Sequence, residues 1–198
     1  VTITDGITTY KDELTSIENI IGTQNNDTIT ASSSSVNELS GEAGDDIFYE
    51  TALGLAGDKI DGGDDNDTVD YHLLNSGISV TLNSSTYATV TVGSTTHTIK
   101  NIENIVGTSS KDIIVGDSEN NNIFAGANDD TIGGGTGTNI LDGGDGKDTL
   151  SYAYESVNNV SLTINLHDGT VSGTNISDTV KNIENVIGSN LNDYIKGS

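Results

Sequence analysis

Aspartate recurs at a fixed place within glycine-rich segments of nine residues. In residues 143–151, Gly-Gly-Asp-Gly-Lys-Asp-Thr-Leu-Ser, the sixth residue is an aspartate and the eighth is apolar. Residues 62–70 and 125–133 follow the same plan. A carboxylate next to a glycine-rich loop suits a hard cation, because calcium takes six to eight oxygen ligands and accepts backbone carbonyls that glycine leaves accessible. The pattern therefore predicts calcium binding by repeated units.

A single loop offers too few oxygens for a calcium ion, so the units must be stacked. Loops stacked like neighbouring strands, about 4.8 Å apart, can share one ion. If each unit makes half a turn of a solenoid, every second unit lies on the same edge. The sixth residues then form two blocks, with a third block beginning at Asp193: Asp27, Asn37, Asp46, Asp58 and Asp67, followed by Asp112, Asn121, Asp130, Asn139 and Asp148.

Each block has one edge made only of aspartates. These two triplets are Asp27, Asp46 and Asp67, and Asp112, Asp130 and Asp148. The opposite edges carry Asn37 with Asp58, and Asn121 with Asn139. We predict two calcium ions within each aspartate triplet, about four in all, and hydrogen-bonded amide ladders where asparagines stack. Asp130 is expected to bind two ions, and Asp148, at the end of its block, only one.

The eighth residue of each unit predicts a narrow core shared by all turns. It is always apolar: Ile29, Leu39, Phe48, Ile60, Val69, Ile114, Ile123, Ile132, Leu141, Leu150 and Ile195. We therefore expect an all-β solenoid whose loops face water. The first block is less regular than the second, and we expect its extra residues, at 32–35 and 50–52, to bulge outward.

Longer segments separate the blocks and also repeat. Ile-Glu-Asn-Ile at 17–20 and 102–105, and Ile-Glu-Asn-Val at 183–186, each precede a block. The alternating residues 78–83 and 160–165 predict half-buried strands. Tyr71 and Tyr152 close equivalent blocks. The expected division is the end of a connector (1–21), a first block (22–71), a strand-rich connector (72–106), a second block (107–152), a second strand-rich connector (153–187) and the start of a third block (188–198).

The composition is strongly acidic and lacks cysteine. Thirty Asp and Glu against seven Lys give a net charge of −23. Such a surface repels nucleic acid and anionic membranes, so neither nucleic-acid binding nor membrane insertion is expected. Without cysteine, the chain has neither disulfides nor a thiolate metal site. It begins at Val1 and ends just after a unit starts, which indicates a piece of a longer protein.

Other chemistries fit the sequence poorly. The glycine-rich residues 133–137 lack the strand–helix context of a phosphate-binding loop. His72, His97 and His167 are scattered and are expected to be surface or connector residues. Adjacent acids such as Asp64-Asp65 follow the repeat register, and no nucleophile accompanies them. We therefore expect no enzyme in this segment.

The nine-residue unit resembles the calcium-binding repeat of the RTX (repeats-in-toxin) family, Gly-Gly-x-Gly-x-Asp-x-(apolar)-x. Residues 143–151 match every fixed position, residues 62–70 lack only the third glycine (Asp65), and residues 41–49 lack only the second (Glu42). The resemblance implies a right-handed parallel β-roll, calcium-triggered folding, and export by type I secretion to the extracellular space or the cell surface.

The resemblance also implies a set of calcium ligands. The carboxylates would be those of Asp27, Asp46, Asp58, Asp67, Asp112, Asp130 and Asp148. The loop carbonyls would be those of Gly22, Gly41, Gly44, Gly62, Gly63, Asp65, Gly107, Ala125, Asn128, Gly143, Gly144 and Gly146. Where asparagine replaces the aspartate, no site is implied.

Three functions are compatible with this pattern. The favoured one is a calcium-binding structural module of a large secreted or surface protein, of the adhesin or surface-layer type. The second is the accessory roll of an exported protease, lipase or epimerase. The third, a solenoid that binds ice or another ordered surface, is disfavoured because the threonines of residues 86–96 form no regular array. Calcium is the expected partner, with neighbouring repeats or a second copy at the open strand edges.

Overall fold

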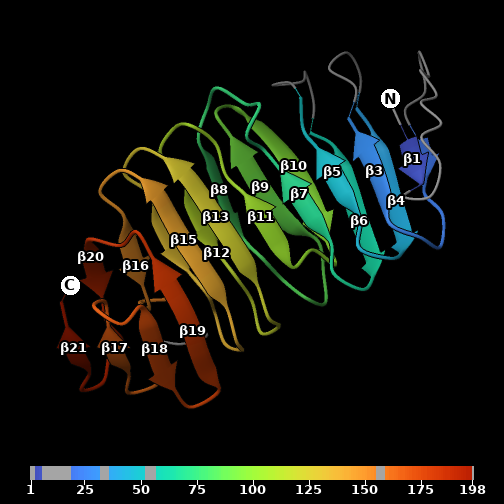
Figure 1. The fold of residues 1–198 in the computed structure, drawn as a ribbon. Helices are drawn as coiled ribbons and strands as arrows, with labels where there is room; N and C mark the ends of the chain where they lie inside the picture. The colour runs from blue at the N-terminus through green and yellow to red at the C-terminus, as the bar shows by residue number, and fades with distance from the viewer. Residues whose placement is uncertain (1–2, 6–18, 32–35, 52–56, 155–158, 198) are drawn as a thin grey trace.

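Two β-sheets face each other in the computed structural model, which describes residues 3–5, 19–31, 36–51, 57–154 and 159–197. Sheet A contains, in spatial order, β1 (Ile3–Asp5), β3 (Asp27–Thr30), β5 (Ile47–Tyr49), β7 (Thr68–Asp70), β11 (Asn104–Val106), β13 (Asn122–Ala127), β15 (Ile140–Asp145), β19 (Ile176–Lys181), β18 (Thr170–Gly173), β17 (Thr163–Asn165) and β21 (Tyr194–Lys196). Sheet B contains β2 (Asn19–Ile21), β4 (Glu38–Ala43), β6 (Lys59–Asp64), β10 (Thr95–Lys100), β9 (Ala88–Val92), β8 (Ile78–Thr81), β12 (Ile113–Val115), β14 (Thr131–Gly133), β16 (Thr149–Ser151) and β20 (Asn185–Ile187). β1 and β21 lie at opposite ends of the molecule (Figure 1).

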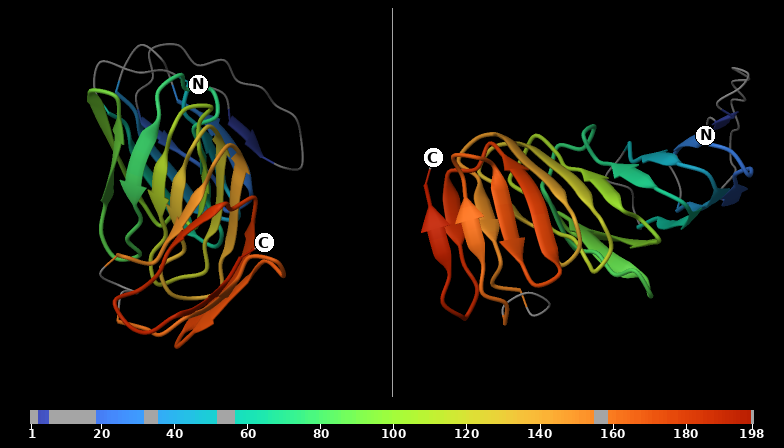
Figure 2. Two further views of the ribbon diagram at one scale, coloured as in Figure 1. Left: turned by 90° about the vertical axis from the view of Figure 1, so that its left-hand side faces the viewer. Right: turned by 60° about the horizontal axis from the view of Figure 1, so that its bottom comes forward.

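Successive units alternate between the two sheets, so each unit makes half a turn. Units two apart are parallel neighbours, and their eighth residues are in register: Ile29 pairs with Phe48, and Phe48 with Val69. In the second block Ile123 pairs with Leu141 in the same way. The prediction of a parallel β-roll is therefore confirmed. Figure 2 shows the two sheets enclosing a flat interior.

The core is a thin layer between the sheets. Side chains from the eighth position fill it: Ile29, Phe48, Ile60, Val69, Ile114, Ile123, Ile132, Leu141 and Leu150 are all fully buried. Tyr71 and Tyr152, which close the two blocks, are the largest side chains in this layer. In the described ranges no helix is long and apolar enough to cross a membrane.

Each long connector forms an antiparallel three-stranded meander that is part of the roll. Strands β8, β9 and β10 enter sheet B between β6 and β12, and the outer two pair in parallel with those block strands. Strands β17, β18 and β19 enter sheet A instead. Of the predicted strand over residues 160–165, only Thr163–Asn165 is extended in the sheet.

Because each meander occupies one sheet only, successive large repeats are rotated by half a turn. The strands that follow the three Ile-Glu-Asn motifs are β2, β11 and β20, which lie in sheets B, A and B. The aspartates of the first block consequently precede strands of sheet A, whereas those of the second block precede strands of sheet B. The two aspartate triplets thus lie on opposite edges of the roll.

One predicted outward loop is wrong in part. Residues 32–35 and 52–56 lie outside the described residues, but Glu50 is described and is only 1% exposed. Glu50 occupies the first position of its unit, where most units have glycine. A side chain at that position points into the roll, so the extra residues of this loop do not carry Glu50 outward.

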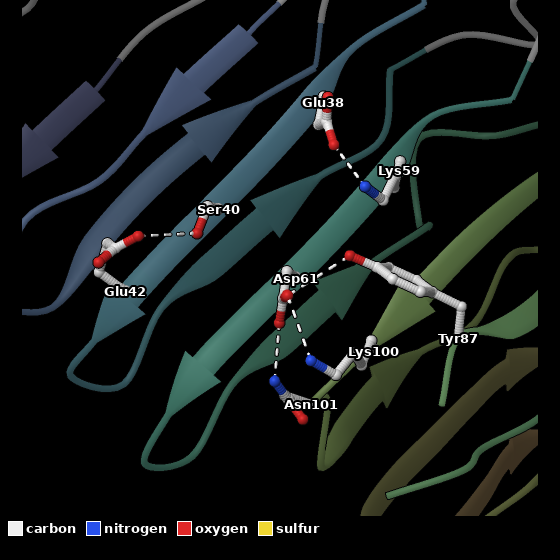
Figure 3. A network of polar contacts seen from close by, with 8 residues as sticks. All are labelled: Glu38, Ser40, Glu42, Lys59, Asp61, Tyr87, Lys100 and Asn101. Atoms are coloured by element: carbon white, nitrogen blue, oxygen red, sulfur yellow. Dashed lines mark hydrogen bonds and ion pairs between the residues drawn. The ribbon is translucent and has the colours of Figure 1, made fainter. Parts of the chain in front are cut away.

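Polar side chains on the outer face of sheet B join the first connector to the first block (Figure 3). Asp61 on β6 accepts a hydrogen bond from Asn101 Nδ2 (2.7 Å), and its Oδ2 lies 3.4 Å from Tyr87 Oη and 3.5 Å from Lys100 Nζ. Exposed pairs of this kind contribute about 0–1 kcal/mol each. The shared core, rather than this network, therefore holds the connector in place.

Candidate calcium ladders

The carboxylates of each triplet are linked into a ladder through the backbone. The N–H of Asp27 donates to Asp46 Oδ1 (2.7 Å), and the N–H of Asp46 donates to Asp67 Oδ1 (2.9 Å). On the opposite edge, Asp112 donates to Asp130 (2.7 Å) and Asp130 to Asp148 (2.8 Å) in the same way. Every carboxylate after Asp27 thus has one oxygen fixed by the preceding turn, whereas Oδ1 of Asp27 is buried without a hydrogen-bond partner among the described residues.

Each ladder ends in a glutamate that the sequence analysis missed. The N–H of Asp67 donates to Glu103 Oε2 and that of Asp148 to Glu184 Oε2, both at 2.8 Å. Both glutamates belong to the repeated Ile-Glu-Asn motif, where the loop is too short for an aspartate at the sixth place. The glutamate side chain is one methylene longer than that of aspartate, and this extra length lets its carboxylate reach the ladder from the shorter loop. Asp148 therefore does not end its ladder, contrary to the sequence prediction.

We call the four carboxylates Asp27, Asp46, Asp67 and Glu103 the first ladder. Asp112, Asp130, Asp148 and Glu184 form the second ladder. In both, the second oxygen of the two middle aspartates is buried without a hydrogen-bond partner among the described residues: Oδ2 of Asp46, Asp67, Asp130 and Asp148. A buried carboxylate oxygen without a partner is strongly destabilising unless a cation balances it.

Three of the unpartnered oxygens, on Asp46, Asp67 and Asp148, face the glycine at the first position of their loop; in the loop of Asp130 this position is Ala125. A Cβ added to Gly41 would lie 1.9 Å from Asp46 Oδ2 and 2.4 Å from the carbonyl oxygen of Gly62 in the next turn. A Cβ on Gly62 would lie 2.4 Å from Asp67 Oδ2 and 2.0 Å from the Asn101 carbonyl oxygen. Carboxylate and carbonyl oxygens of successive turns therefore converge beside the glycine, which is the donor set that calcium prefers.

The predicted carbonyl donors occupy two kinds of position in these loops. The first position is occupied by Gly22, Gly41, Gly62, Gly107, Ala125 and Gly143, and each of these glycines lies close to the aspartate of its unit. Gly44, Gly63, Asp65, Asn128, Gly144 and Gly146 stand at the second or fourth position and have positive φ. The positive φ values turn the peptide units of these loops.

The first loop of each ladder has a different, closed conformation. The N–H of Thr23 donates to Asp27 Oδ2 (2.5 Å), and that of Thr108 donates to Asp112 Oδ2 (2.6 Å). Asp112 Oδ1 also accepts the N–H of Ile78 (2.7 Å). Ser189 caps Asp193 in the same manner at the start of the third block (2.7 Å). A protein N–H thus satisfies the oxygen that is unpartnered in the later turns.

Burial raises the pKa of the middle carboxyl groups. The pKa of Asp46 rises from 3.8 to about 6, and the pKa values of Asp67 and Asp130 rise to about 7. Desolvation is the main cause, the carboxylates of neighbouring turns add to it, and the ladder hydrogen bonds offset it in part. Without a bound cation these groups therefore compete for protons near neutral pH.

The edge opposite each aspartate triplet contains amides, as predicted. The N–H of Asn121 donates to Asn139 Oδ1 (2.8 Å), and Asn139 Nδ2 donates to Asp178 Oδ1 (2.8 Å). In the first block the corresponding ladder runs from Asn37 to Asp58 Oδ1 (2.7 Å). Asp58 is therefore separate from the first ladder and lies on the other edge.

A glycine at position 42 should stabilise the protein. Glu42 has φ of 81°, whereas the equivalent position of the next turn is Gly63. The left-handed region costs a non-glycine residue about 1–2 kcal/mol, and the greater chain entropy of glycine offsets about half of this. Among the described residues, the Glu42 side chain makes one hydrogen bond, an exposed one with Ser40 Oγ (3.2 Å, Figure 3). We expect Glu42→Gly to raise the Tm by about 2–4 °C in thermal unfolding with calcium.

The reciprocal substitution is the control. Gly63→Glu should lower the Tm, because φ is 115° and a Cβ would lie 2.2 Å from the Glu42 carbonyl oxygen. A lower Tm for Glu42→Gly would contradict the strain assigned to this loop.

The comparison with protein families agrees with this geometry. The family model of the RTX calcium-binding nonapeptide repeat (four copies) matches residues 54–73, 106–141 and 134–152. Among solved structures, the extracellular lipase LipA from Serratia marcescens is similar, with 16% identity and a TM-score of 0.39 over 89% of this chain. The chain spans only 40% of that lipase. No curated protein matches the sequence.

Fold and ladders together define a parallel β-roll whose stacked loops present carboxylates and carbonyls to cations. The matching repeats identify these loops as RTX repeats. The chain therefore contains RTX calcium-binding repeats, and this part of it is a structural calcium-binding module.

Proposed function

We propose that this module folds on meeting extracellular calcium and serves as a structural segment of a secreted or cell-surface protein. The observation that carries the proposal is the set of four buried, unpartnered carboxylate oxygens on Asp46, Asp67, Asp130 and Asp148. Four ions would each join one of these aspartates to the following turn. Their number equals the sequence prediction, but each lies one turn further along the ladder, because Thr23 and Thr108 close the first loops.

The energetics suit a switch that responds to calcium outside the cell. Extracellular calcium modules bind with Kd of about 10⁻⁴–10⁻³ M, so submicromolar cytosolic calcium would leave these sites unfilled. At 100 times its Kd, one ion adds about 2.7 kcal/mol to the free energy of unfolding, and four add on the order of 10 kcal/mol. This is comparable with the whole stability of a domain, about 5–15 kcal/mol. Calcium would then decide whether the chain is folded.

The arrangement of the large repeats favours an extended array of the adhesin or surface-layer type. Both meanders are built into the sheets, so one large repeat passes into the next without a break in the roll. The third motif is followed by another capped loop, 188–193, which repeats the start of the first two blocks. The second candidate is the accessory roll of an exported enzyme. Neighbouring sequence made of further large repeats supports the array, whereas a catalytic domain supports the accessory roll.

The direct test is a calcium titration followed by far-UV circular dichroism. We expect a disordered spectrum in EGTA and a change to a β-rich spectrum as calcium approaches millimolar concentration, with no such change in magnesium, which dehydrates reluctantly and demands octahedral geometry. A β-rich spectrum in EGTA would show that the core and the amide ladders alone hold the fold. Calcium would then be an accessory rather than the trigger.

A further inference from the structure

One group of buried polar side chains lies outside both calcium ladders. Glu50, Asp58, His97 and Tyr71, which we call the interior cluster, lie inside the roll on the edge opposite the first ladder. Glu50, His97 and Tyr71 are each at most 1% exposed, and Asp58 is 5% exposed. One oxygen of each carboxylate and one imidazole nitrogen lie within 4.8 Å of one another. This set of one imidazole and two carboxylates differs from the all-oxygen ladders.

Hydrogen bonding leaves the interior cluster unsatisfied. His97 Nδ1 accepts the N–H of Asp58 (3.1 Å), so it has no proton to donate to Glu50 Oε1, which lies 3.4 Å away. Within the part of the chain that the structure describes, Glu50 Oε1, His97 Nε2 and Tyr71 Oη have no hydrogen-bond partner. Two electron-pair donors that face each other in a buried site require a proton or a metal cation between them.

The second large repeat provides an internal comparison. The residues at the equivalent positions are Gly134, Asn139, Asp178 and Tyr152. There the hydroxyl of Tyr152 donates to Asp178 Oδ2 (2.5 Å) and Asn139 Nδ2 donates to Asp178 Oδ1 (2.8 Å). Direct hydrogen bonds thus close that site. In the first repeat, the positions of Gly134, Asn139 and Asp178 are all occupied by side chains that ligate metals: Glu50, Asp58 and His97.

We propose that the interior cluster binds one borderline divalent cation, for which zinc is the probe, through Glu50, Asp58 and His97. The separation of 3.4 Å between His97 Nδ1 and Glu50 Oε1 matches the roughly 3.3–3.4 Å between two ligands of a tetrahedral zinc with bonds of about 2.0–2.1 Å. The imidazole selects such a metal over calcium, which prefers oxygen. Water or the Tyr71 hydroxyl takes the fourth position.

The surroundings of the interior cluster orient these ligands. Asn37 donates to Asp58 Oδ1 through both its N–H (2.7 Å) and its Nδ2 (3.0 Å), which fixes the carboxylate as an outer-shell partner does. Zinc at Nδ1 replaces the hydrogen bond from Asp58, which at 3.1 Å is longer than those of the calcium ladders. Because the site is enclosed, the metal would enter during folding.

The test refolds the unfolded, metal-free chain in excess calcium, which keeps the ladders filled, with increasing zinc present, and measures the zinc that stays bound to the folded protein after gel filtration. We expect one zinc per chain. The triple variant Glu50→Gly/Asp58→Asn/His97→Asp, which installs the residues of the second repeat, should weaken zinc binding by more than about 100-fold. Its calcium response should be unchanged. The matched control, His72→Asn/His167→Asn, removes the two exposed histidines and should keep the zinc site.

A second measurement avoids dependence on how the triple variant folds. In ¹⁵N-histidine NMR spectra of the unaltered protein, zinc should shift the ring signals of His97 and leave those of His72 and His167 in place. The single variant His97→Asn keeps an acceptor for the Asp58 N–H, as Asn139 does for Asn121, and should also lose zinc. The proposal is overturned if no zinc binds in excess calcium, if the His97 variants retain it, or if calcium alone displaces it.

Discussion

Replacing Asp130 by asparagine should remove most of the calcium-dependent stabilisation of the second ladder. The amide oxygen can still accept the N–H of Asp112, but an NH₂ group takes the place of the unpartnered Oδ2. Loss of one ion at 100 times its Kd removes about 2.7 kcal/mol, and the donor directed at the neighbouring site weakens that site too. In thermal unfolding with saturating calcium we expect the Tm to fall by roughly 5–10 °C.

Asp112→Asn is the matched control for this prediction. Both oxygens of Asp112 already accept protein N–H groups, from Ile78 and Thr108. The substitution therefore breaks a hydrogen bond whether or not calcium is present. We expect the same loss of stability in calcium and, if the calcium-free chain folds at low pH, in EGTA. If Asp112→Asn reduced the calcium-dependent gain in Tm as much as Asp130→Asn, the four-ion arrangement would be wrong.

The variant Asp148→Asn distinguishes the ladder seen in the structure, which continues to Glu184, from the ladder expected from the sequence, which ends at Asp148. A ladder that stopped at Asp148 would give this variant a smaller effect than Asp130→Asn. Because Glu184 continues the ladder, and because Asp148 Oδ2 is also unpartnered, we expect the two variants to lose similar calcium-dependent stability. A clearly smaller loss for Asp148→Asn would show that Glu184 contributes no calcium ligand.

The sequence predicts the roll well because nine-residue spacing directly encodes half a turn. The apolar eighth residues and the glycine loops repeat at that spacing, so the sheets and the stacking of Asp112, Asp130 and Asp148 follow from counting. Glu103 and Glu184 escape such counting because their loops are shorter. Their signal is the acidic residue that recurs in each Ile-Glu-Asn motif.

Other features depend on three-dimensional facts that spacing does not contain. The opposite placement of the two aspartate triplets requires that each meander enter a single sheet, which no local pattern specifies. Glu50 sits in a loop with inserted residues, where the unit boundary is ambiguous, so its inward direction was not predicted. His97 was expected to be a surface or connector residue. It does belong to a connector, but β10 pairs with β6 and directs the side chain inward, where it is 1% exposed.

Acid should stabilise the calcium-free protein and destabilise the calcium-bound protein. In the folded state, the pKa of Asp46 is about 6 and those of Asp67 and Asp130 are about 7, against 3.8 when unfolded. Between about pH 4 and about pH 6 to 7, these carboxyl groups are therefore protonated in the folded state and ionised in the unfolded state. Their contribution to stability is fully present below about pH 4 and is lost as the pH rises through about 6 to 7.

The expected effect is large. A pKa difference of one unit corresponds to about 1.4 kcal/mol, and all three raised pKa values change the free energy of unfolding in the same direction. The pKa of His97 is lowered by burial, and its contribution, lost below about pH 6.5, acts in the opposite direction. Three carboxyl groups favour folding in acid against one histidine that opposes it, so the net effect of acid on the calcium-free protein is stabilising. Calcium-free protein should gain β-structure between about pH 8 and about pH 5.

Circular dichroism and urea unfolding across this pH range, in EGTA and in saturating calcium, check both halves of the prediction. With calcium bound, protons compete with the ion for the same oxygens, so stability should fall as the pH drops below about 7. The variant Asp46→Asn/Asp67→Asn/Asp130→Asn should show a smaller acid-induced gain, because its amides do not titrate whereas other buried carboxyl groups, such as Asp112 and Asp148, still do. Acid neutralises both the buried carboxylates and the excess negative charge of the surface. If calcium-free protein became less stable on acidification, neither of these charges could be the cause that opposes its folding.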